Sequence, residues 1–166
     1  MFNVAIITLS DKGSMGKRED ITGKKLADFI NGKEEYEVKY YTMIPDDKEM
    51  LKNEIIKLCD LDLDLILTNG GTGFSKRDIT PEATKEVIER EIPGISEYIR
   101  MESCKITKKA MLSRGISGIR RNTVIINLPG SPKGAIESIE FVIDTIGHGI
   151  DILKGEAVEC ANDRQV

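Results

Sequence analysis

The chain has 166 residues, of which 40% are hydrophobic and 31% charged, values typical of one soluble globular domain. The net charge of -4 and the lack of aromatic residues interleaved with basic ones argue against a nucleic-acid-binding protein. No apolar run reaches the roughly 18 residues that a membrane span needs. The three cysteines are far apart, which favours reduced thiols, so we expect a cytoplasmic protein.

Four short apolar runs predict core strands, at residues 4–9, 38–42, 65–68 and 124–128. The first has no basic segment before it, so we interpret it as a strand and not as a signal peptide. Apolar spacing predicts helices at residues 21–30, 48–58, 81–89 and 133–153, the last with an expected break at residues 147–149. Within the less regular segment 94–118, we expect a helix at 98–101 and a loop or short strand at 111–115.

Strands that alternate with helices predict a mostly parallel sheet covered on both faces, which is a three-layer α/β/α arrangement. We expect residues 1–160 to form this single domain and residues 161–166 to be a disordered tail. His148 is the only histidine and no GxSxG motif accompanies it, so we expect a structural role for it and no Ser-His-Asp triad.

Polar clusters follow the predicted strands. They are Ser10-Asp11 with Asp20, Pro45-Asp46-Asp47, the glycine turn 68–73 with Asp78, and residues 127–133. Because ligands of open α/β sheets bind at the carboxyl ends of strands, we expect these clusters to meet at one edge. Glycines let backbone N–H groups approach phosphate oxygens, and nearby carboxylates suit Mg²⁺. The pattern therefore predicts a site for ligands that carry phosphates.

Two of the helices have recognisable starting signals. Thr80 is the expected N-cap of the helix that begins at Pro81, since proline is tolerated in the first helical position. Ser131 and Pro132 form the same arrangement before the last helix.

Each carboxylate also has a structural interpretation. Asp46 stands three residues before Glu49, as in a capping box, and spacing alone favours capping over catalysis. Asp78 is equally well explained by ordering its own turn, while Asp11 and Asp20 are typical loop carboxylates. The glycine turn is weak evidence by itself, because the chain lacks the GxxxxGK[ST] motif of P-loop proteins and the GxGxxG motif of dinucleotide-binding folds.

The joint arrangement resembles the molybdenum-cofactor biosynthesis domain of MogA and MoaB proteins. The family signature is similar to residues 68–73 (TNGGTG) and 77–83 (RDITPEA), and the resemblance extends to residues 9–11, 44–46, 112–114 and 127–133. Asn69 stands where many members carry Thr, a change that keeps the polarity of the position.

This resemblance implies molybdopterin adenylyltransferase activity, in which the terminal phosphate of molybdopterin attacks the α-phosphorus of ATP and pyrophosphate leaves. Such a reaction needs positioning and charge neutralisation more than covalent help. The resemblance places the two catalytic, metal-binding carboxylates at Asp46 and Asp78, with Mg²⁺ as the metal ion. The residues that it implies for substrate and nucleotide binding are Ser10, Asp11, Asp20, Gly70, Gly71, Thr72, Gly73, Thr80, Pro81, Glu82, Ser113, Asn127, Pro129, Gly130, Ser131 and Lys133.

The resemblance also implies a homotrimer and contact with a MoeA-type metal-insertion protein.

Three alternatives to the adenylyltransferase function are open. A MoaB-type protein would serve the tungsten branch or only bind pterin, although the presence of both Asp46 and Asp78 favours activity. A non-catalytic scaffold is typical of fused multidomain proteins, and a CinA-type nucleotide-processing protein usually carries a further C-terminal domain. Neither a scaffold nor a CinA-type protein is expected for a chain of 166 residues.

Overall fold

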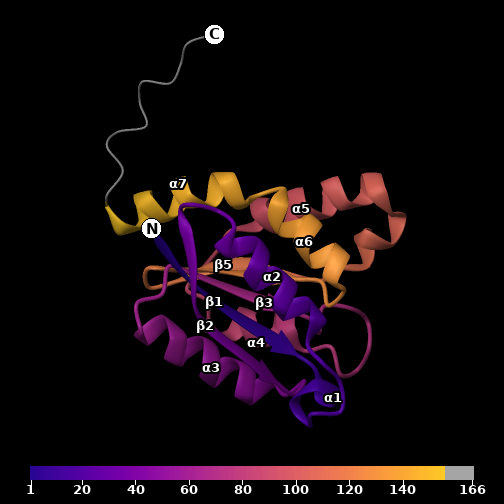
Figure 1. Cartoon of the computed structure of the whole chain (residues 1–166). Coiled ribbons are helices and arrows are strands. Elements are labelled where there is room, and N and C mark those ends of the chain that lie inside the picture. Colours follow the sequence, from indigo (N-terminus) through magenta and orange to yellow (C-terminus); the bar gives the residue numbers. More distant parts are fainter. Residues whose placement is uncertain (156–166) are drawn as a thin grey trace.

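A six-stranded sheet with the order β2-β1-β3-β6-β5-β4 forms the centre of the structure, a computed structural model that describes residues 1–155 (Figure 1). The strands are β1 (Phe2–Leu9), β2 (Tyr36–Ile44), β3 (Leu65–Asn69), β4 (Arg90–Glu91), β5 (Ser117–Arg120) and β6 (Thr123–Leu128). Strands β2, β1, β3 and β6 are parallel, whereas β5 is antiparallel to β6 and β4 is antiparallel to β5. The predicted mostly parallel sheet is confirmed, with a short antiparallel extension at one side.

Helices cover both faces of this sheet. They are α1 (Asp11–Ser14), α2 (Ile21–Asn31), α3 (Lys48–Asp60), α4 (Thr80–Val87), α5 (Pro93–Ile106), α6 (Pro132–Glu140), α7 (Ile143–Lys154) and the 3-10 helix η1 (Lys108–Leu112). Helices α2, α5, α6 and α7 lie on one face, and α3 and α4 lie on the other (Figure 1). The three predicted layers are therefore present. The predicted tail, residues 161–166, and the predicted end of the domain at residue 160 lie outside the described residues.

The alternating side chains of β1 explain why helices are needed on both faces. Val4 and Ile6 pack into the core formed with α2, α6 and α7, while Ala5 and Ile7 pack into the core formed with α3 and α4. All four side chains are fully buried. A strand buried on both faces has a continuous apolar sequence, and parallel neighbours require crossover connections such as these helices. No helix within residues 1–155 combines the length and the apolar character that crossing a membrane requires.

Two helix predictions need correction. The predicted helix 133–153 is two helices, because the chain leaves helical geometry at Val142 and not at residues 147–149, which lie inside α7. The predicted short helix 98–101 is part of the much longer α5. Ile95, Ile99 and Ile106 of α5 have helical spacing, so the sequence carried a signal for a longer helix that the prediction did not use.

Gly147 is required by close packing and does not break the helix. A Cβ atom at Gly147 would lie 2.9 Å from Cε2 of Phe2 and 3.1 Å from the hydroxyl oxygen of Tyr36. That hydroxyl donates a hydrogen bond to the carbonyl oxygen of Ile143 (2.8 Å), which fixes Tyr36 against α7. A Cβ at Gly149 would meet no atom within 4 Å.

The two glycines of α7 provide a matched pair of alanine substitutions. Both gain helix propensity, by about 1 kcal/mol each, so any difference between them reports the packing. Gly149→Ala is expected to raise the free energy of unfolding by up to about 1 kcal/mol, whereas Gly147→Ala is expected to lower it because the methyl group meets Phe2. Urea denaturation of the two variants and the parent protein measures both values. Equal stabilisation by the two substitutions would contradict the packing role of Gly147.

Candidate functional site

The carboxyl ends of the parallel strands surround a polar cavity of about 320 Å³, called the edge cavity below. Strands β1, β2, β3 and β6 all point their carboxyl ends to this side of the sheet. The residues singled out by the sequence that line the edge cavity are Ser10, Asp20, Asp46, Gly70, Gly71, Asp78 and Gly130. The four polar clusters therefore meet at one edge, as expected for a ligand site of an open α/β sheet.

Asp46 lies in the loop after β2 and is joined to Asp11, the first residue of α1, which follows β1. The backbone N–H of Asp11 donates to Asp46 Oδ2 (3.2 Å), and the backbone N–H of Asp46 donates to Asp11 Oδ1 (3.0 Å). The capping interpretation of Asp46 is wrong, because Asp47 is the N-cap of α3 and accepts a hydrogen bond from the N–H of Met50 (2.8 Å). The Asp46 carboxylate is thus held at the cavity wall and not at the helix terminus.

The surroundings of Asp46 oppose its negative charge. Burial raises the pKa of the Asp46 carboxyl above its usual value, and the charges of Asp11 and Asp78 raise it further. The hydrogen bond from the Asp11 N–H and the charge of Arg77 act in the opposite direction without cancelling the rise. A cation bound beside Asp46 would relieve this cost, since a positive neighbour favours the ionised form of a carboxyl group.

Arg77, to which the sequence analysis gave no role, holds Asp11 beside the edge cavity. Its Nε donates to Asp11 Oδ2 (3.0 Å) and its Nη2 donates to Asp11 Oδ1 (2.6 Å), a bidentate pair. The hydrogen bond from Arg77 is the main reason that the pKa of Asp11 is lowered. Arg18 was also missed, although it lines the edge cavity. The only available signal was its place in the loop between Asp11 and Asp20.

Asp78 serves its own turn and also faces the edge cavity. Its Oδ2 accepts a hydrogen bond from the backbone N–H of Ser75 (2.8 Å), as the structural interpretation expected. The same carboxylate lines the edge cavity together with Asp46. The turn therefore fixes the direction of a carboxylate that remains available to a ligand.

Only glycine fits positions 70 and 71 of the glycine turn. Gly70 and Gly71 have φ values of 99° and 66°, in the left-handed region that other residues avoid. A Cβ at Gly70 would lie 2.7 Å from the carbonyl oxygen of Leu9, and a Cβ at Gly71 would overlap the hydroxyl of Thr80. The Gly70 N–H donates to the carbonyl oxygen of Leu128 (3.1 Å), so this N–H supports the turn itself.

The prediction that Thr80 caps α4 is wrong. The N-cap position belongs to Ile79, which provides no side-chain hydrogen bond. The buried hydroxyl of Thr80 instead donates to the carbonyl oxygen of Gly70 (2.8 Å), and the Thr80 N–H donates to that of Gly71 (3.1 Å). Thr80 therefore ties the glycine turn to the start of α4.

A second cavity, of about 240 Å³, lies between α5, η1 and the turn before α6. Four of the residues singled out by the sequence line it: Ser113, Asn127, Pro129 and Ser131. Ser131 is also the N-cap of α6, as predicted, and accepts a hydrogen bond from the N–H of Gly134 (3.2 Å). Arg100 and Lys109 add positive charge to this cavity and were not anticipated.

The side chain of Asn127 is occupied by protein partners. Its Nδ2 donates to the hydroxyl oxygens of Thr68 and Thr84, both at 2.9 Å, and its Oδ1 accepts from the N–H of Ile116 (3.2 Å). Asn127 thereby joins β6 to β3 and α4 at the base of the second cavity. The geometry gives it a role in holding these elements together.

Some residues singled out by the sequence line neither cavity: Asp11, Thr72, Gly73, Thr80, Pro81, Glu82 and Lys133. Lys133 is largely exposed and pairs with Glu137 (3.6 Å). Glu82 pairs with Arg114, and Thr72 is buried with its carbonyl oxygen accepting from the Arg114 N–H (2.9 Å).

Replacing Asp46 by Asn is expected to raise the melting temperature at neutral pH. The folded state raises the pKa of Asp46 above the ordinary value of 3.8, so it binds this proton more tightly than the unfolded chain does. The ionised carboxylate therefore costs stability at neutral pH, and the cost disappears as the pH falls below the unfolded pKa. Thermal unfolding of Asp46→Asn and the parent, at neutral pH and at about pH 3.5, should show an advantage for the variant that is lost in acid. A variant that melts lower than the parent at neutral pH would contradict this account.

Comparisons with known proteins agree with this geometry. A family model described as a probable molybdopterin binding domain matches residues 5–148. A molybdopterin adenylyltransferase of Helicobacter pylori is 37% identical over 169 residues, covering 99% of this chain and 94% of that protein. The solved structure of the molybdopterin biosynthesis enzyme MoaB of Thermus thermophilus is similar with a TM-score of 0.88 at 45% identity, covering 96% of this chain and 100% of that one. The tungsten cofactor synthesizing protein MoaB of Pyrococcus furiosus gives a TM-score of 0.82 at 31% identity, covering 93% and 96%. The chain therefore belongs to the molybdopterin-binding-domain family of MogA and MoaB proteins.

Proposed function

We propose that this protein is a molybdopterin adenylyltransferase, which transfers AMP from ATP to the terminal phosphate of molybdopterin and releases pyrophosphate. The observation that carries the proposal is the placement of Asp46 and Asp78 in one polar cavity beside the glycine turn. Membership of the family and the full-length similarity to a molybdopterin adenylyltransferase support it.

The transfer forms one P–O bond and breaks another. An oxygen of the terminal phosphate of molybdopterin bonds to the α-phosphorus of ATP, and the bond from that phosphorus to the bridging oxygen breaks, so that pyrophosphate leaves. The attacking oxygen is already anionic, so the reaction depends on alignment and on neutralising charge. Gly70, Gly71 and Gly130 carry no side chain and leave room along the cavity wall for phosphate groups.

Magnesium is the cation that we propose for the edge cavity. Asp46 and Asp78 fit it, because Mg²⁺ is usually held by one or two carboxylates with oxygens of substrate phosphates. When bound, it would neutralise charge on the phosphates of ATP. Within residues 1–155, no group of three or more His, Cys, Asp and Glu side chains is arranged to hold a metal ion. The proposal therefore requires oxygen ligands from the nucleotide as well.

Asp78→Asn is expected to lower turnover by at least about 100-fold, since an amide cannot provide the anionic oxygen that neutralises a cation at the transition state. The Asn side chain can still accept from the Ser75 N–H, so the fold should persist. The assay mixes protein, molybdopterin, ATP and Mg²⁺ and follows pyrophosphate and the adenylylated product. Asp28→Asn, an exposed substitution on α2, is the matched control. Full turnover by Asp78→Asn would show that Asp78 is not catalytic.

A role in the tungsten branch is the second candidate. The similarity to the tungsten cofactor synthesizing MoaB of Pyrococcus furiosus, at 31% identity, favours it. Both branches use the same transfer of AMP in this proposal, so the assay tests the shared step. Supplying molybdate or tungstate with a MoeA-type metal-insertion protein would then separate the two branches.

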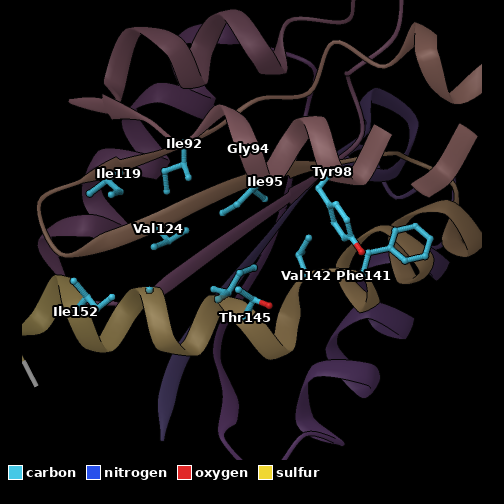
Figure 2. Close-up of a pocket in the computed structure, with 12 residues that line it drawn as sticks. Ile92, Gly94, Ile95, Tyr98, Ile119, Val124, Phe141, Val142, Thr145 and Ile152 are labelled. Atoms are coloured by element: carbon cyan, nitrogen blue, oxygen red, sulfur yellow. The ribbon is translucent and has the colours of Figure 1, made fainter. Parts of the chain in front are cut away.

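A homotrimer is a further part of the proposal. An apolar groove of about 620 Å³ lies between α5, β5 and α7, and Figure 2 shows Ile95, Tyr98, Ile119 and Ile152 among the side chains around it. Large exposed apolar surfaces are typical of protein interfaces.

Contact with a MoeA-type protein and a cytoplasmic location complete the proposal. Contact with a MoeA-type protein is supported because the adenylylated product is ready for metal insertion. The cytoplasmic location is supported by the free thiols of Cys59 and Cys104.

Charged substitutions in the apolar groove are expected to dissociate the trimer. Tyr98 and Ile152 are 44% and 53% exposed in the single chain, so Glu at either position should leave the monomer folded. Met50, 47% exposed on α3 at the opposite face of the sheet, provides the matched control Met50→Glu. Sedimentation velocity should give a trimer for the parent and for Met50→Glu, and a smaller species for Tyr98→Glu and Ile152→Glu. A trimer that survives both groove substitutions would place the interface elsewhere, and a monomeric parent would contradict the trimer itself.

A further inference from the structure

Arg114 directs its whole side chain to the segment that carries Asp78. Its Nε donates to the carbonyl oxygen of Gly73 (2.7 Å), its Nη2 donates to that of Asp78 (2.8 Å), and its Nη1 pairs with the Glu82 carboxylate. The backbone N–H of Arg114 donates to the carbonyl oxygen of Thr72 (2.9 Å). One guanidinium group therefore binds both ends of the loop between Gly73 and Asp78 and the first turn of α4.

The loop 73–78 depends on such outside support. Residues 74–77 are exposed, and the hydrogen bonds between Ser75 and Asp78 close a local turn without anchoring it to the domain. The other anchor is the pair of Arg77 with Asp11, whose side chains are 63% and 34% exposed. Exposed ion pairs contribute little because solvent screens them. The contacts of Arg114 with two backbone carbonyls are the more effective anchor.

The contacts require arginine specifically. The guanidinium group is planar and presents its N–H donors in a rigid fork, so that two carbonyl oxygens and one carboxylate can be bound in one plane. A lysine ammonium is a point charge on a flexible stem and does not reproduce this geometry. Arg114 lines neither the edge cavity nor the second cavity, so its effect on a ligand would pass through Asp78.

We propose that Arg114 is a positioning residue for adenylyl transfer: by holding the carbonyl groups of Gly73 and Asp78, it fixes the direction in which the Asp78 carboxylate enters the edge cavity. This inference rests on the proposed function. Small displacements of a reacting group are costly, since about 1 Å can lower a rate on the order of 100-fold.

The test compares Arg114→Lys with the parent protein. The variant keeps the positive charge and loses the fork, so kcat for AMP transfer is expected to fall about 10- to 100-fold, with a much smaller change in KM for ATP. Hydrogen exchange without ligands should show faster exchange of the Ser75 and Asp78 amides in the variant. The matched control is Arg120→Lys, because Arg120 also donates to a backbone carbonyl, that of Val87 (2.9 Å), at the other end of the sheet. This control should keep both kcat and the exchange rates of the Ser75 and Asp78 amides at the values of the parent protein.

The outcomes separate the inference from the function on which it rests. Unchanged kcat, or lower kcat with unchanged exchange at Ser75 and Asp78, would overturn the positioning role. If the parent transfers no AMP, the proposed function fails, and unchanged exchange in Arg114→Lys would reject the anchor independently. If Arg114→Lys does not fold, Glu82→Gln weakens the hold on the same guanidinium group and should produce both changes to a smaller extent. Glu82→Gln with wild-type exchange of the loop would then count against the inference.

Discussion

The parallel pairing of β2, β1, β3 and β6 is the constraint on which the site depends, because it brings four separate loops to one edge. The register places Leu9 opposite Ile44, and Asn69 opposite both Thr8 and Leu128. The residues that follow these strands must then lie beside one another. A shift of this register by one residue would exchange the buried faces of the strands as well as misplace the loops. The two apolar cores therefore protect the geometry of the polar edge.

Charge is distributed unevenly within this edge. Four carboxylates, those of Glu19, Asp20, Asp46 and Asp78, line the edge cavity with the guanidinium of Arg18. Such a wall attracts a cation and opposes an unaccompanied polyphosphate. The second cavity differs, since Arg100 and Lys109 line it together with Glu137. The two cavities thus offer different electrostatic surroundings on neighbouring parts of the same edge.

Local sequence was sufficient for most features whose deciding partners are close in the chain. The core strands were predictable because both faces are apolar, and the cap at Ser131 was predictable because its partner Gly134 is three residues away. Thr80 was misassigned because its hydroxyl bonds to Gly70, which only the folded turn brings near. Asp46 is an exception, because the cap belongs to its neighbour Asp47, whose partner Met50 is only three residues further along the chain.

Roles that depend on distant partners could not be read from the sequence. Arg77 meets Asp11 across 66 positions of the chain, and Arg114 meets Gly73 across 41. Both arginines stand within motifs that the sequence made visible, but spacing does not reveal which carbonyl or carboxylate a long side chain will reach. The length of α5 was underestimated for a different reason, since Ile95, Ile99 and Ile106 have helical spacing and the prediction did not use it.

The order of the strands has a consequence for synthesis on the ribosome. The first three strands to emerge, β1, β2 and β3, can pair with one another, yet β3 then presents an unpaired apolar edge until β6 follows more than fifty residues later. Exposed strand edges invite pairing with other chains, and non-local pairing is slow to form. The edge cavity draws on residues from Thr8 to Pro132, so a nascent chain acquires the site only after β6 has closed the sheet.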